Sequence, residues 1–370
     1  MRIAISGATG FIGSNLRVRL AELGHQDLVL LPHEATPAQL HELLKGVRFV
    51  FHLAGVNRPR DPQDYLAGNS GFTRLLCEAM SAQAPKPDIL FSSSTQAAGD
   101  SVYGQSKRAA EQQVLDYAGQ HGVRAHLFRL TNVFGKWSRP NYNSAVATFC
   151  HNVARDLPIT VHDPRAPLRL VHVDDVLNCF IQLLQHGGAT GLHDCGPEYE
   201  TTVGEVAALI QSFKDSRETL MSTRVGSGLV RALYATYVSF LPADRFAYQV
   251  ARHSDPRGVF VEMLKTPDSG QFSYFTAHPG VTRGEHYHHA KTEKFLVIKG
   301  HAHFGFRHIV TQERHELIVE GGDARIVETA PGWTHNITNI GNEELIVMLW
   351  ANEVFDRARP DTVAMPVNPT

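Results

Sequence analysis

Short apolar segments alternate with longer amphipathic segments over the first half of the chain. Five apolar segments have the length of buried strands, and they lie at residues 3–6, 28–31, 47–54, 88–93 and 124–130. The segments between them carry apolar residues at helical spacing. Strands and helices that alternate in this way are typical of a parallel sheet covered by helices on both faces. The pattern therefore predicts an α/β domain over residues 1 to about 185.

The pattern becomes all-β after about residue 255. Alternating segments separated by Gly and Pro lie at residues 259–264, 271–277, 294–299, 302–308, 315–319 and 345–350, and they predict an antiparallel barrel. Helical stretches lie between the two parts, and the first begins with a capping box of Thr202 and Glu205. These stretches are expected to form a substrate lobe of the first domain. We therefore predict two domains, residues 1–245 and 246–370.

Three glycines follow the first predicted strand and precede a helical segment. Glycines in such a turn let main-chain N–H groups approach a pyrophosphate at the start of a helix, which predicts a dinucleotide site in a Rossmann-type domain. The spacing G-x-x-G-x-x-G resembles the extended branch of the short-chain dehydrogenase/reductase (SDR) superfamily, which works on nucleotide sugars. The resemblance implies cofactor contacts at Gly7, Thr9, Gly10, Phe11, Ile12 and Gly13, and at Leu53 and Ala54 after the third strand.

A tyrosine and a lysine lie four residues apart in a later helix. Tyr103 and Lys107 share one helix face, so the ammonium is expected to lower the pKa of the phenol and make Tyr103 a general acid. Ser94 ends the preceding strand and is expected to hydrogen-bond the same substrate carbonyl oxygen, with Thr95 as the alternative. The set predicts a carbonyl reductase, in which Tyr103 and Lys107 also contact the cofactor.

The end of the second predicted strand favours NADPH over NADH. An acidic residue at this position binds the ribose 2′-hydroxyl of NAD, and its absence leaves room for a 2′-phosphate. The strand ends in Pro32 and His33, and Glu34 comes one or two residues late. His33 is the candidate partner of the phosphate, and Arg17 is the alternative.

Two further residues point to the other half of the substrate. Asn132 and Arg169 match positions at which nucleotide-sugar reductases hold a pyrophosphate. A guanidinium suits two phosphates because it donates several hydrogen bonds in a plane. The resemblance therefore implies a UDP-sugar substrate bound by Asn132 and Arg169.

Composition and charge argue against several other classes of function. The chain has 370 residues and a formal charge of −2, so neither nucleic acid nor a membrane surface is an expected partner. Four cysteines lie without CxxC spacing, which is typical of reduced thiols in the cytosol. Residue 3 already belongs to the first strand, and no apolar run reaches about 18 residues. A cytoplasmic protein is expected.

Histidine and glutamate lie at the spacing of metal ligands in the barrel part. His286 and His288 share one face of a strand, Glu293 follows five residues later, and His335 lies about forty residues further on. Three imidazoles and a carboxylate form a four-ligand site that suits zinc or another divalent metal. Both halves of the pattern resemble the motifs of the cupin family, jelly-roll barrels that hold a metal inside.

Part of this region also resembles the deoxysugar 3,5-epimerases, in which Arg-Gly-x-His supplies a proton-abstracting histidine. His286 therefore has two interpretations, general base or metal ligand, and the presence of Glu293 and His335 favours the metal. The metal would polarise a sugar carbonyl, and another residue must then move the proton. Lys294 is the first candidate, because those epimerases have a lysine after the histidine segment. The other candidates are Tyr274, His289, Glu262 and Lys265.

Over its whole length the chain resembles the bifunctional reductase–cupin enzymes of bacterial surface-polysaccharide synthesis, known as CapF or WbjC. The resemblance lies in residues 132–151, 283–297 and 350–356. It implies an α/β Rossmann-type (extended SDR) domain followed by an all-β cupin jelly-roll barrel, and a homodimer. The cupin domain would epimerise carbon 3 of a UDP-2-acetamido-2,6-dideoxy-hexos-4-ulose. The SDR domain would then reduce the 4-keto group with NADPH to UDP-N-acetyl-L-talosamine, on the route to UDP-N-acetyl-L-fucosamine.

Two alternatives from other classes stay open at this stage. The chain could be a nucleotide-sugar 4-epimerase or dehydratase whose cupin part only dimerises or senses a ligand. Dehydratases of this superfamily have Asp-Glu after the catalytic Thr or Ser, where this chain has Gln96 after Thr95, which favours simple reduction. The chain could also be a non-catalytic regulator that reads NADPH. The complete Ser94, Tyr103 and Lys107 set argues against that, because a sensor needs no proton donor.

Overall fold

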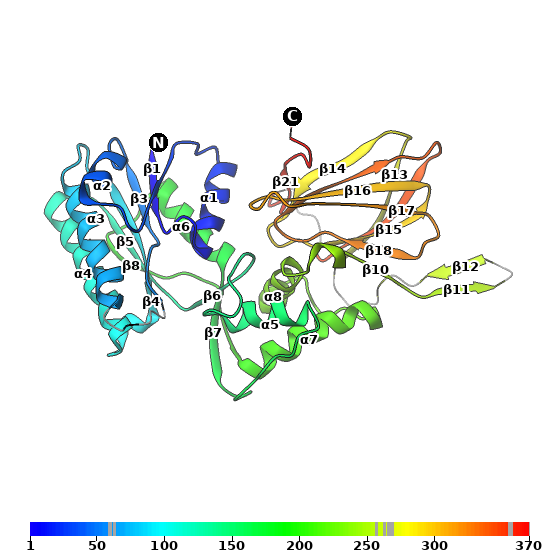
Figure 1. Ribbon diagram of the computed structural model, residues 1–370, viewed down its shortest axis with the longest axis horizontal. Helices are drawn as coiled ribbons and strands as arrows, with labels where there is room; N and C mark the ends of the chain where they lie inside the picture. The colour runs from blue at the N-terminus through cyan, green and yellow to red at the C-terminus, as the bar shows by residue number, and fades with distance from the viewer. Residues whose placement is uncertain are drawn as a thin grey trace. The chain divides into compact units, whose positions relative to one another are not determined.

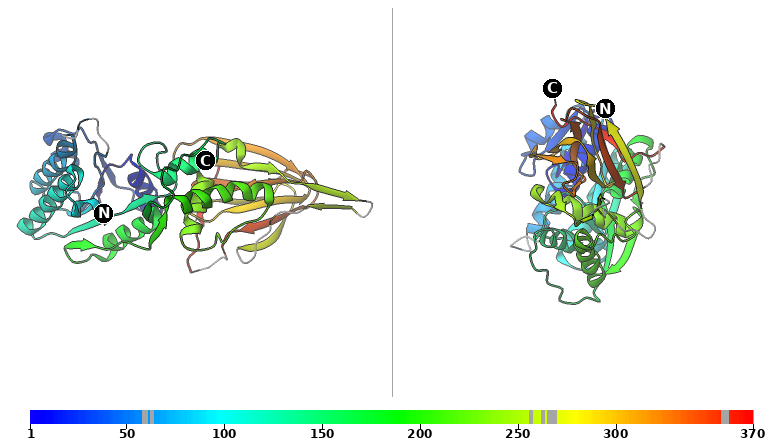
Figure 2. Two further views of the ribbon diagram at one scale, coloured as in Figure 1. Left: turned by 90° about the horizontal axis from the view of Figure 1, so that it is seen from below. Right: turned by 90° about the vertical axis from the view of Figure 1, so that its right-hand side faces the viewer.

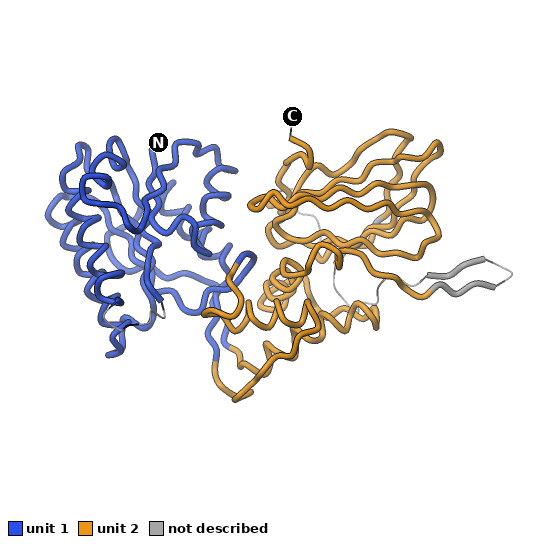
Figure 3. The backbone as a smooth tube through the Cα atoms, in the orientation of Figure 1, with its two compact units in different colours: residues 1–137, 168–200 blue, residues 138–167, 201–370 orange. Residues whose placement is uncertain are grey.

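The computed structural model describes residues 1–57, 61, 64–255, 258–261, 264, 270–353 and 358–369. It divides the chain into two compact units (Figure 3), residues 1–137 with 168–200 and residues 138–167 with 201–370. The lobe predicted at 201–245 thus belongs to the same compact unit as the barrel. Whether residues 1–245 and 246–370 fold independently stays a prediction. Among the described residues, no helix combines the length and apolar character needed to cross a membrane.

The first unit is built on a six-stranded sheet of order β2-β1-β3-β4-β5-β8 (Figure 1). Its strands are β1 (Ile3–Ser6), β2 (Leu28–Leu31), β3 (Phe49–His52), β4 (Asp88–Ser94), β5 (Ala125–Leu130) and β8 (Gly191–His193). All neighbours run parallel, which confirms the predicted sheet. The strand order reverses beside β1, and this is where α/β sheets bind nucleotides.

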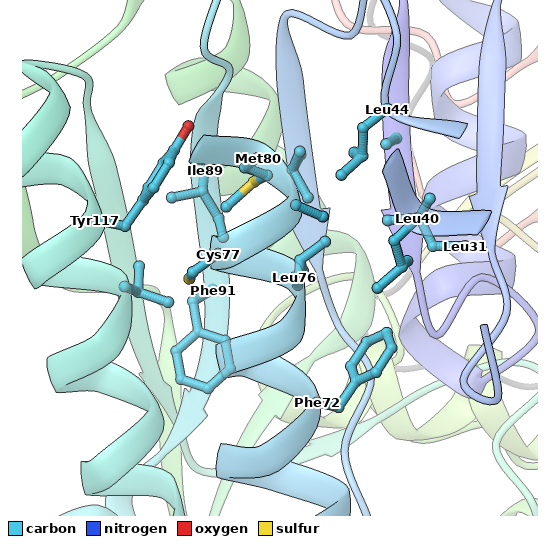
Figure 4. Packing of buried hydrophobic residues seen from close by; sticks show 14 of the residues in the cluster. Leu31, Leu40, Leu44, Phe72, Leu76, Cys77, Met80, Ile89, Phe91 and Tyr117 are labelled. Carbon is cyan, nitrogen blue, oxygen red and sulfur yellow. The ribbon is translucent and has the colours of Figure 1, made fainter. Parts of the chain in front are cut away.

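Helices cover both faces of this sheet. They are α1 (Phe11–Glu22), α2 (Pro37–Leu43), α3 (Phe72–Ser81), α4 (Val102–His121) and α6 (Val173–His186), with the short helices η1 (Leu66–Gly71) and η2 (Thr95–Ala98). The side chains of each strand alternate between the two faces of the sheet and so form two hydrophobic clusters. Ile89 and Phe91 of β4 pack with α2, α3 and α4 (Figure 4), whereas Leu90 packs with α1 and α6 on the other face. Burial of both strand faces explains why these strands read as continuous apolar runs.

A small sheet of order β6-β7-β9 follows, with bounds β6 (Asn132–Phe134), β7 (Pro167–His172) and β9 (Glu198–Thr202). The helices of the second unit are α5 (Ala145–Val153), α7 (Val203–Thr219), α8 (Gly228–Ser239) and the short η3 (Ala243–Arg245). The predicted capping box is confirmed at the start of α7, where the Thr202 side chain accepts from Glu205 N and the Glu205 side chain accepts from Thr202 N. Phe213 of α7 packs edge-on against Tyr234 of α8.

The rest of the second unit is the predicted antiparallel barrel, made of two five-stranded sheets (Figure 2). One has the order β10-β18-β15-β20-β13, and its strands are β10 (Ala247–Gln249), β18 (Arg325–Glu328), β15 (Glu293–Lys299), β20 (Leu345–Ala351) and β13 (Gln271–Ala277). The other has the order β17-β16-β19-β14-β21, with β17 (Arg314–Glu320), β16 (His301–His308), β19 (Trp333–Asn339), β14 (Thr282–Tyr287) and β21 (Val363–Ala364). A separate hairpin joins β11 (Arg252–Asp255) and β12 (Gly258–Val261).

Aromatic side chains join the two sheets of the barrel. Phe295 of β15 and Phe304 of β16 pack with ring centroids 5.8 Å apart, as expected when the inner faces of two sheets interdigitate. The predicted strands do not include β10, β18 or β21. Apolar alternation also does not mark β14 and β19, although the spacing of His286 and His288 indicated a strand at residue 286. Both strands carry histidines that point inward, so the apolar alternation that marks a strand is absent there.

Candidate functional site

The glycine turn of the first unit has the shape that a dinucleotide site requires. Gly7 has φ +68°, and a Cβ there would lie 2.7 Å from Ala54 N. A Cβ at Gly13 would lie 2.1 Å from Gly7 O. Neither position tolerates a side chain, because the conflicting atoms belong to the backbone. The turn is closed by a hydrogen bond from Gly10 N to Gly7 O of 3.0 Å, and the predicted segments around Gly7 and Ala54 therefore lie together.

Helix α1 starts directly after this turn. Gly10 is its N-cap and supplies no side-chain hydrogen bond, and the first turn of α1 contains no acidic residue. The N–H groups of the first turn are therefore available to an anion, and the helix dipole favours one. Thr9 is exposed at the turn, whereas Phe11 and Ile12 are partly buried against the core.

The three predicted reductase residues meet at the end of β4. The side chains of Ser94 and Tyr103 form a hydrogen bond. Lys107 is buried, and its Nζ donates to Ser92 O at 3.0 Å. A Cβ at Gly55 would lie 3.2 Å from Lys107 Nζ. The strand end, the start of α4 and the segment after β3 thus converge on one place.

The predicted effect of Lys107 on Tyr103 was wrong for this structure. Burial raises the pKa of Tyr103, and the hydrogen bond with Ser94 opposes that change only in part. Burial also lowers the pKa of Lys107 to about 8. The Lys107 ammonium is directed to the carbonyl of Ser92, and desolvation of the phenol sets the direction of its pKa shift.

His33 lies where a 2′-phosphate partner was predicted. It is exposed after β2, and its ring stacks on Phe72 with centroids 5.1 Å apart. The stacking holds the imidazole beside the strand end, and Glu34 is also exposed there. The structure leaves the choice between NADH and NADPH as a prediction.

Asn132 and Arg169 lie together, and their contact with a pyrophosphate stays a prediction. Asn132 Nδ2 donates to Arg169 O at 3.0 Å. The Arg169 guanidinium is 59% exposed and forms ion pairs with Glu198 at 2.5 Å and Glu200 at 3.9 Å. A pyrophosphate would therefore compete with two carboxylates for this guanidinium.

In the second unit, the four predicted metal ligands form one cluster. One ligand atom each from His286, His288, Glu293 and His335 lies within 4.8 Å of the others. His286 of β14 stands directly opposite His335 of β19 in the sheet register. His288 Nε2 and His335 Nε2 lie 3.1 and 3.4 Å from the same oxygen, Glu293 Oε2.

A β-bulge directs this part of β14. The register shifts between Gly284 and His286, and Glu285 adopts φ +58°. The Glu285 carboxylate holds the bulge, since it accepts hydrogen bonds from Asn336 Nδ2 and Val367 N, both at 2.7 Å. Bulges of this kind re-aim side chains beside functional sites.

The electrostatics of the cluster fit a divalent cation. Burial, with His335 and His288 nearby, lowers the pKa of His286 to about 4, and burial lowers the pKa of His335. Burial alone would raise the pKa of Glu293, but His288 and His335 hold it well below its usual value. Neutral imidazoles and an ionised carboxylate are the protonation states that a metal requires.

Hydrogen bonds at Nδ1 of His286 and His288 leave Nε2 of each ring available as a metal ligand. His286 Nδ1 donates to Gly284 O at 3.0 Å, and His288 Nδ1 donates to Asp361 O. Main-chain carbonyls commonly fix metal-binding histidines in this way, so that Nε2 faces the ion. The residues present therefore fit a zinc-type site.

Lys294, the first candidate for the proton-transfer base, lies on the other face of β15 from Glu293. Lys294 and Glu293 are neighbours on β15, so their side chains point to opposite faces of the sheet. Burial lowers the pKa of Lys294, as a base would need, but its ammonium contacts Glu328 and the Tyr248 hydroxyl. These contacts direct Lys294 away from the ligand cluster.

The other base candidates differ in position. Tyr274 on β13 is 71% exposed, and His289 packs against Tyr287. Glu262 and Lys265 lie outside the described residues.

Sequence reasoning missed two residues beside the cluster. Lys291 is buried, and its Nζ lies 3.2 Å from Glu293 Oε1. The sequence did hold a signal for it, because Lys291 lies two residues before Glu293 in the same segment. Asp361 accepts hydrogen bonds from the main chain that follows His288, and no local pattern links these distant positions.

Comparisons with known proteins place the chain in a family. Residues 3–194 match the NAD dependent epimerase/dehydratase family, and residues 253–363 match the polysaccharide biosynthesis C-terminal domain. The chain is 54% identical over 369 residues, 99% of each sequence, to the UDP-2-acetamido-2,6-beta-L-arabino-hexul-4-ose reductase of Pseudomonas aeruginosa.

Solved structures agree with these matches. The capsular polysaccharide assembling protein CapF of Staphylococcus aureus has a TM-score of 0.67 and 36% identity, covering 99% of this chain and 100% of that one. RMD of P. aeruginosa, solved with NADPH, has a TM-score of 0.51 and 25% identity, covering 58% of this chain and 83% of that one. The chain therefore belongs to the NAD-dependent epimerase/dehydratase family and, over its whole length, to the CapF-like reductase–cupin proteins.

Proposed function

We propose that this chain is a bifunctional nucleotide-sugar enzyme. Its barrel epimerises carbon 3 of a UDP-2-acetamido-2,6-dideoxy-hexos-4-ulose, and its first unit reduces the 4-keto group with NADPH to UDP-N-acetyl-L-talosamine. The observation that carries the proposal is the presence of two groups of functional residues in one chain, a proton-donor set beside a glycine turn and a His₃Glu cluster. The name of the 54% identical relative, a reductase of a UDP-4-keto sugar, supports the substrate class.

In the reductase site, NADPH bound at the glycine turn would supply the hydride that reduces carbon 4. Tyr103 then donates its phenolic proton to the oxygen of the former ketone. Ser94 already shares a hydrogen bond with Tyr103, so its hydroxyl lies where it can also bind that oxygen and stabilise the developing negative charge. The buried Lys107, whose Nζ donates to Ser92 O, would bind the cofactor ribose and orient the set. The high phenol pKa keeps Tyr103 protonated, which a general acid requires.

In the barrel, His286, His288, Glu293 and His335 would hold the metal. A bound zinc ion would act as a Lewis acid on a substrate oxygen. The chain positions this chemistry with His286 and His288 from the β14 segment, Glu293 from β15 and His335 from β19.

The chemistry sets the order of the two reactions. The 4-keto group acidifies the hydrogen on carbon 3, so that this centre can be inverted only while the ketone is present. Reduction removes the acidity and fixes the new configuration. Epimerisation therefore precedes reduction.

Replacement of Tyr103 by Phe tests whether reduction and epimerisation take place at separate sites. The variant should lose NADPH oxidation, because it lacks the proton donor, and it should still exchange the carbon-3 hydrogen with solvent deuterium. Exchange is followed by mass spectrometry of the UDP-sugar. Loss of both activities in a folded variant would overturn the two-site proposal, and retained NADPH oxidation would remove Tyr103 from the reductase.

A further inference from the structure

The segment that follows residue 357 lies along β14, the strand that carries His286 and leads into His288. β21 pairs with β14 on the side away from β19. Met365 N donates to Glu285 O at 2.8 Å, and Val367 N donates to the Glu285 carboxylate at 2.7 Å. The main chain on the N-terminal side of His286 is thus held by residues about 80 positions later in the chain.

One aspartate in this segment organises the C-terminal side. The Asp361 carboxylate accepts three successive main-chain hydrogen bonds, from His289 N at 2.8 Å and from Ala290 N and Lys291 N, both at 2.7 Å. Its own main-chain oxygen accepts from His288 Nδ1. The Asp361 side chain is only 14% exposed, so these bonds are shielded from water.

These contacts act on the connection between two ligands. Residues 289–292 join His288 to Glu293, and their conformation decides whether both side chains reach one ion. A carboxylate that accepts three consecutive N–H groups fixes this turn, because each of them would otherwise need another acceptor. The bond to His288 Nδ1 holds the imidazole with Nε2 toward Glu293.

We propose that Asp361 is a positioning residue of the metal site and sets its affinity for zinc. The inference rests on the proposed metal site. It adds that the segment after residue 357 makes the contacts that hold the metal ligands in place. Asp361 binds no metal itself. It acts through the His288 tautomer and through the turn that carries Glu293.

Zinc affinity measured by competition with a chromophoric chelator tests this proposal. Asp361→Ala removes the three carboxylate contacts to the turn and keeps the main-chain oxygen that accepts from His288 Nδ1. Because the turn sets the position of Glu293, zinc should bind about 10–100-fold more weakly, the usual cost of losing contacts that orient a ligand. Asp361→Asn keeps one acceptor oxygen, so its loss should be smaller. Asp323→Asn is the matched control, since Asp323 also accepts a main-chain N–H, from Glu320 at 3.0 Å, in a turn of the same barrel.

The outcomes separate this inference from the proposed metal function. Wild-type protein that binds no stoichiometric zinc would overturn both. Wild-type protein that binds zinc, together with an unchanged Kd in Asp361→Ala, would overturn only the role of Asp361, even where that variant melts at a lower temperature. If Asp361→Ala is insoluble, Asp361→Asn decides, and a Kd equal to that of the control would overturn the proposal. The cobalt-loaded variants should also show an altered visible spectrum, which a purely structural role would leave unchanged.

Discussion

Glu328 bridges two buried cations on the outer side of the barrel, and its replacement should destabilise the second unit strongly. Its carboxylate pairs with Lys294 and with Arg217 of α7, whose side chains are 3% and 14% exposed. The Tyr248 ring also covers the Arg217 guanidinium at 4.1 Å. Glu328→Gln keeps the shape but leaves two buried positive charges without their partner.

The expected loss follows from this geometry. Removing one partner of a buried ion pair typically costs about 3–5 kcal/mol, which is a factor of roughly 10²–10⁴ in the unfolding equilibrium. Lys294→Met should cost less, about 1–3 kcal/mol, because Glu328 keeps its pair with Arg217. Glu316→Gln is the control, since Glu316 pairs with His303 on the surface and is 60% exposed.

Scanning calorimetry and carbon-3 hydrogen exchange measure the two consequences. From most to least stable, the variants should rank Glu316→Gln, Lys294→Met and Glu328→Gln. Folded Lys294→Met should retain carbon-3 hydrogen exchange. A Glu328→Gln variant as stable as the control would refute the energetic reasoning. Loss of exchange in folded, metal-loaded Lys294→Met would show that Lys294 is the proton-transfer base after all.

Two other predictions concern the cofactor turn and pH. Gly13→Ala should lose NADPH binding, measured by fluorescence titration, because the new Cβ would lie 2.1 Å from Gly7 O. Its zinc content should stay unchanged. Gly119→Ala is the control and should bind NADPH normally, because a Cβ at Gly119 in α4 meets nothing within 4 Å. The metal-free protein should lose stability as pH falls from the unfolded His value near 6.5 toward 4, because His286, with a folded pKa of about 4, takes up its proton more readily when unfolded. Melting temperatures in a chelator at pH 7 and pH 5 measure this, and equal values would contradict it.

Local patterns predicted those parts of the fold whose burial is regular. Five strands of the first sheet were predicted because they are continuous apolar runs, and β13, β15, β16, β17 and β20 of the barrel were predicted because their apolar positions alternate. Apolar alternation does not mark β14 and β19, because the inward positions of His286 and His335 are polar. Consecutive residues of a strand face opposite sides of the sheet. The sequence alone therefore indicates that Lys294, next to the ligand Glu293, points away from the metal site.

Other features depend on contacts between distant residues. Burial raises the pKa of Tyr103, and burial cannot be read from a four-residue spacing. Asp361 lies about 70 residues from the turn that it holds, in a segment without a recognisable motif. Local helical patterns also gave no indication that α7 and α8 belong to the same compact unit as the barrel.

The central claim is that the barrel is a metal-dependent site, and the metal content of ligand variants tests it most directly. Elemental analysis of purified His288→Ala and Glu293→Gln should show little or no zinc, because each leaves three of four ligands. Carbon-3 exchange should be lost with the metal, and direct reduction of the unepimerised 4-ketone should persist. His301→Ala, which changes a surface histidine paired with Glu320, should retain both zinc and exchange. Wild-type protein without stoichiometric metal, with exchange that chelators leave untouched, would instead make His286 a base and contradict the metal site.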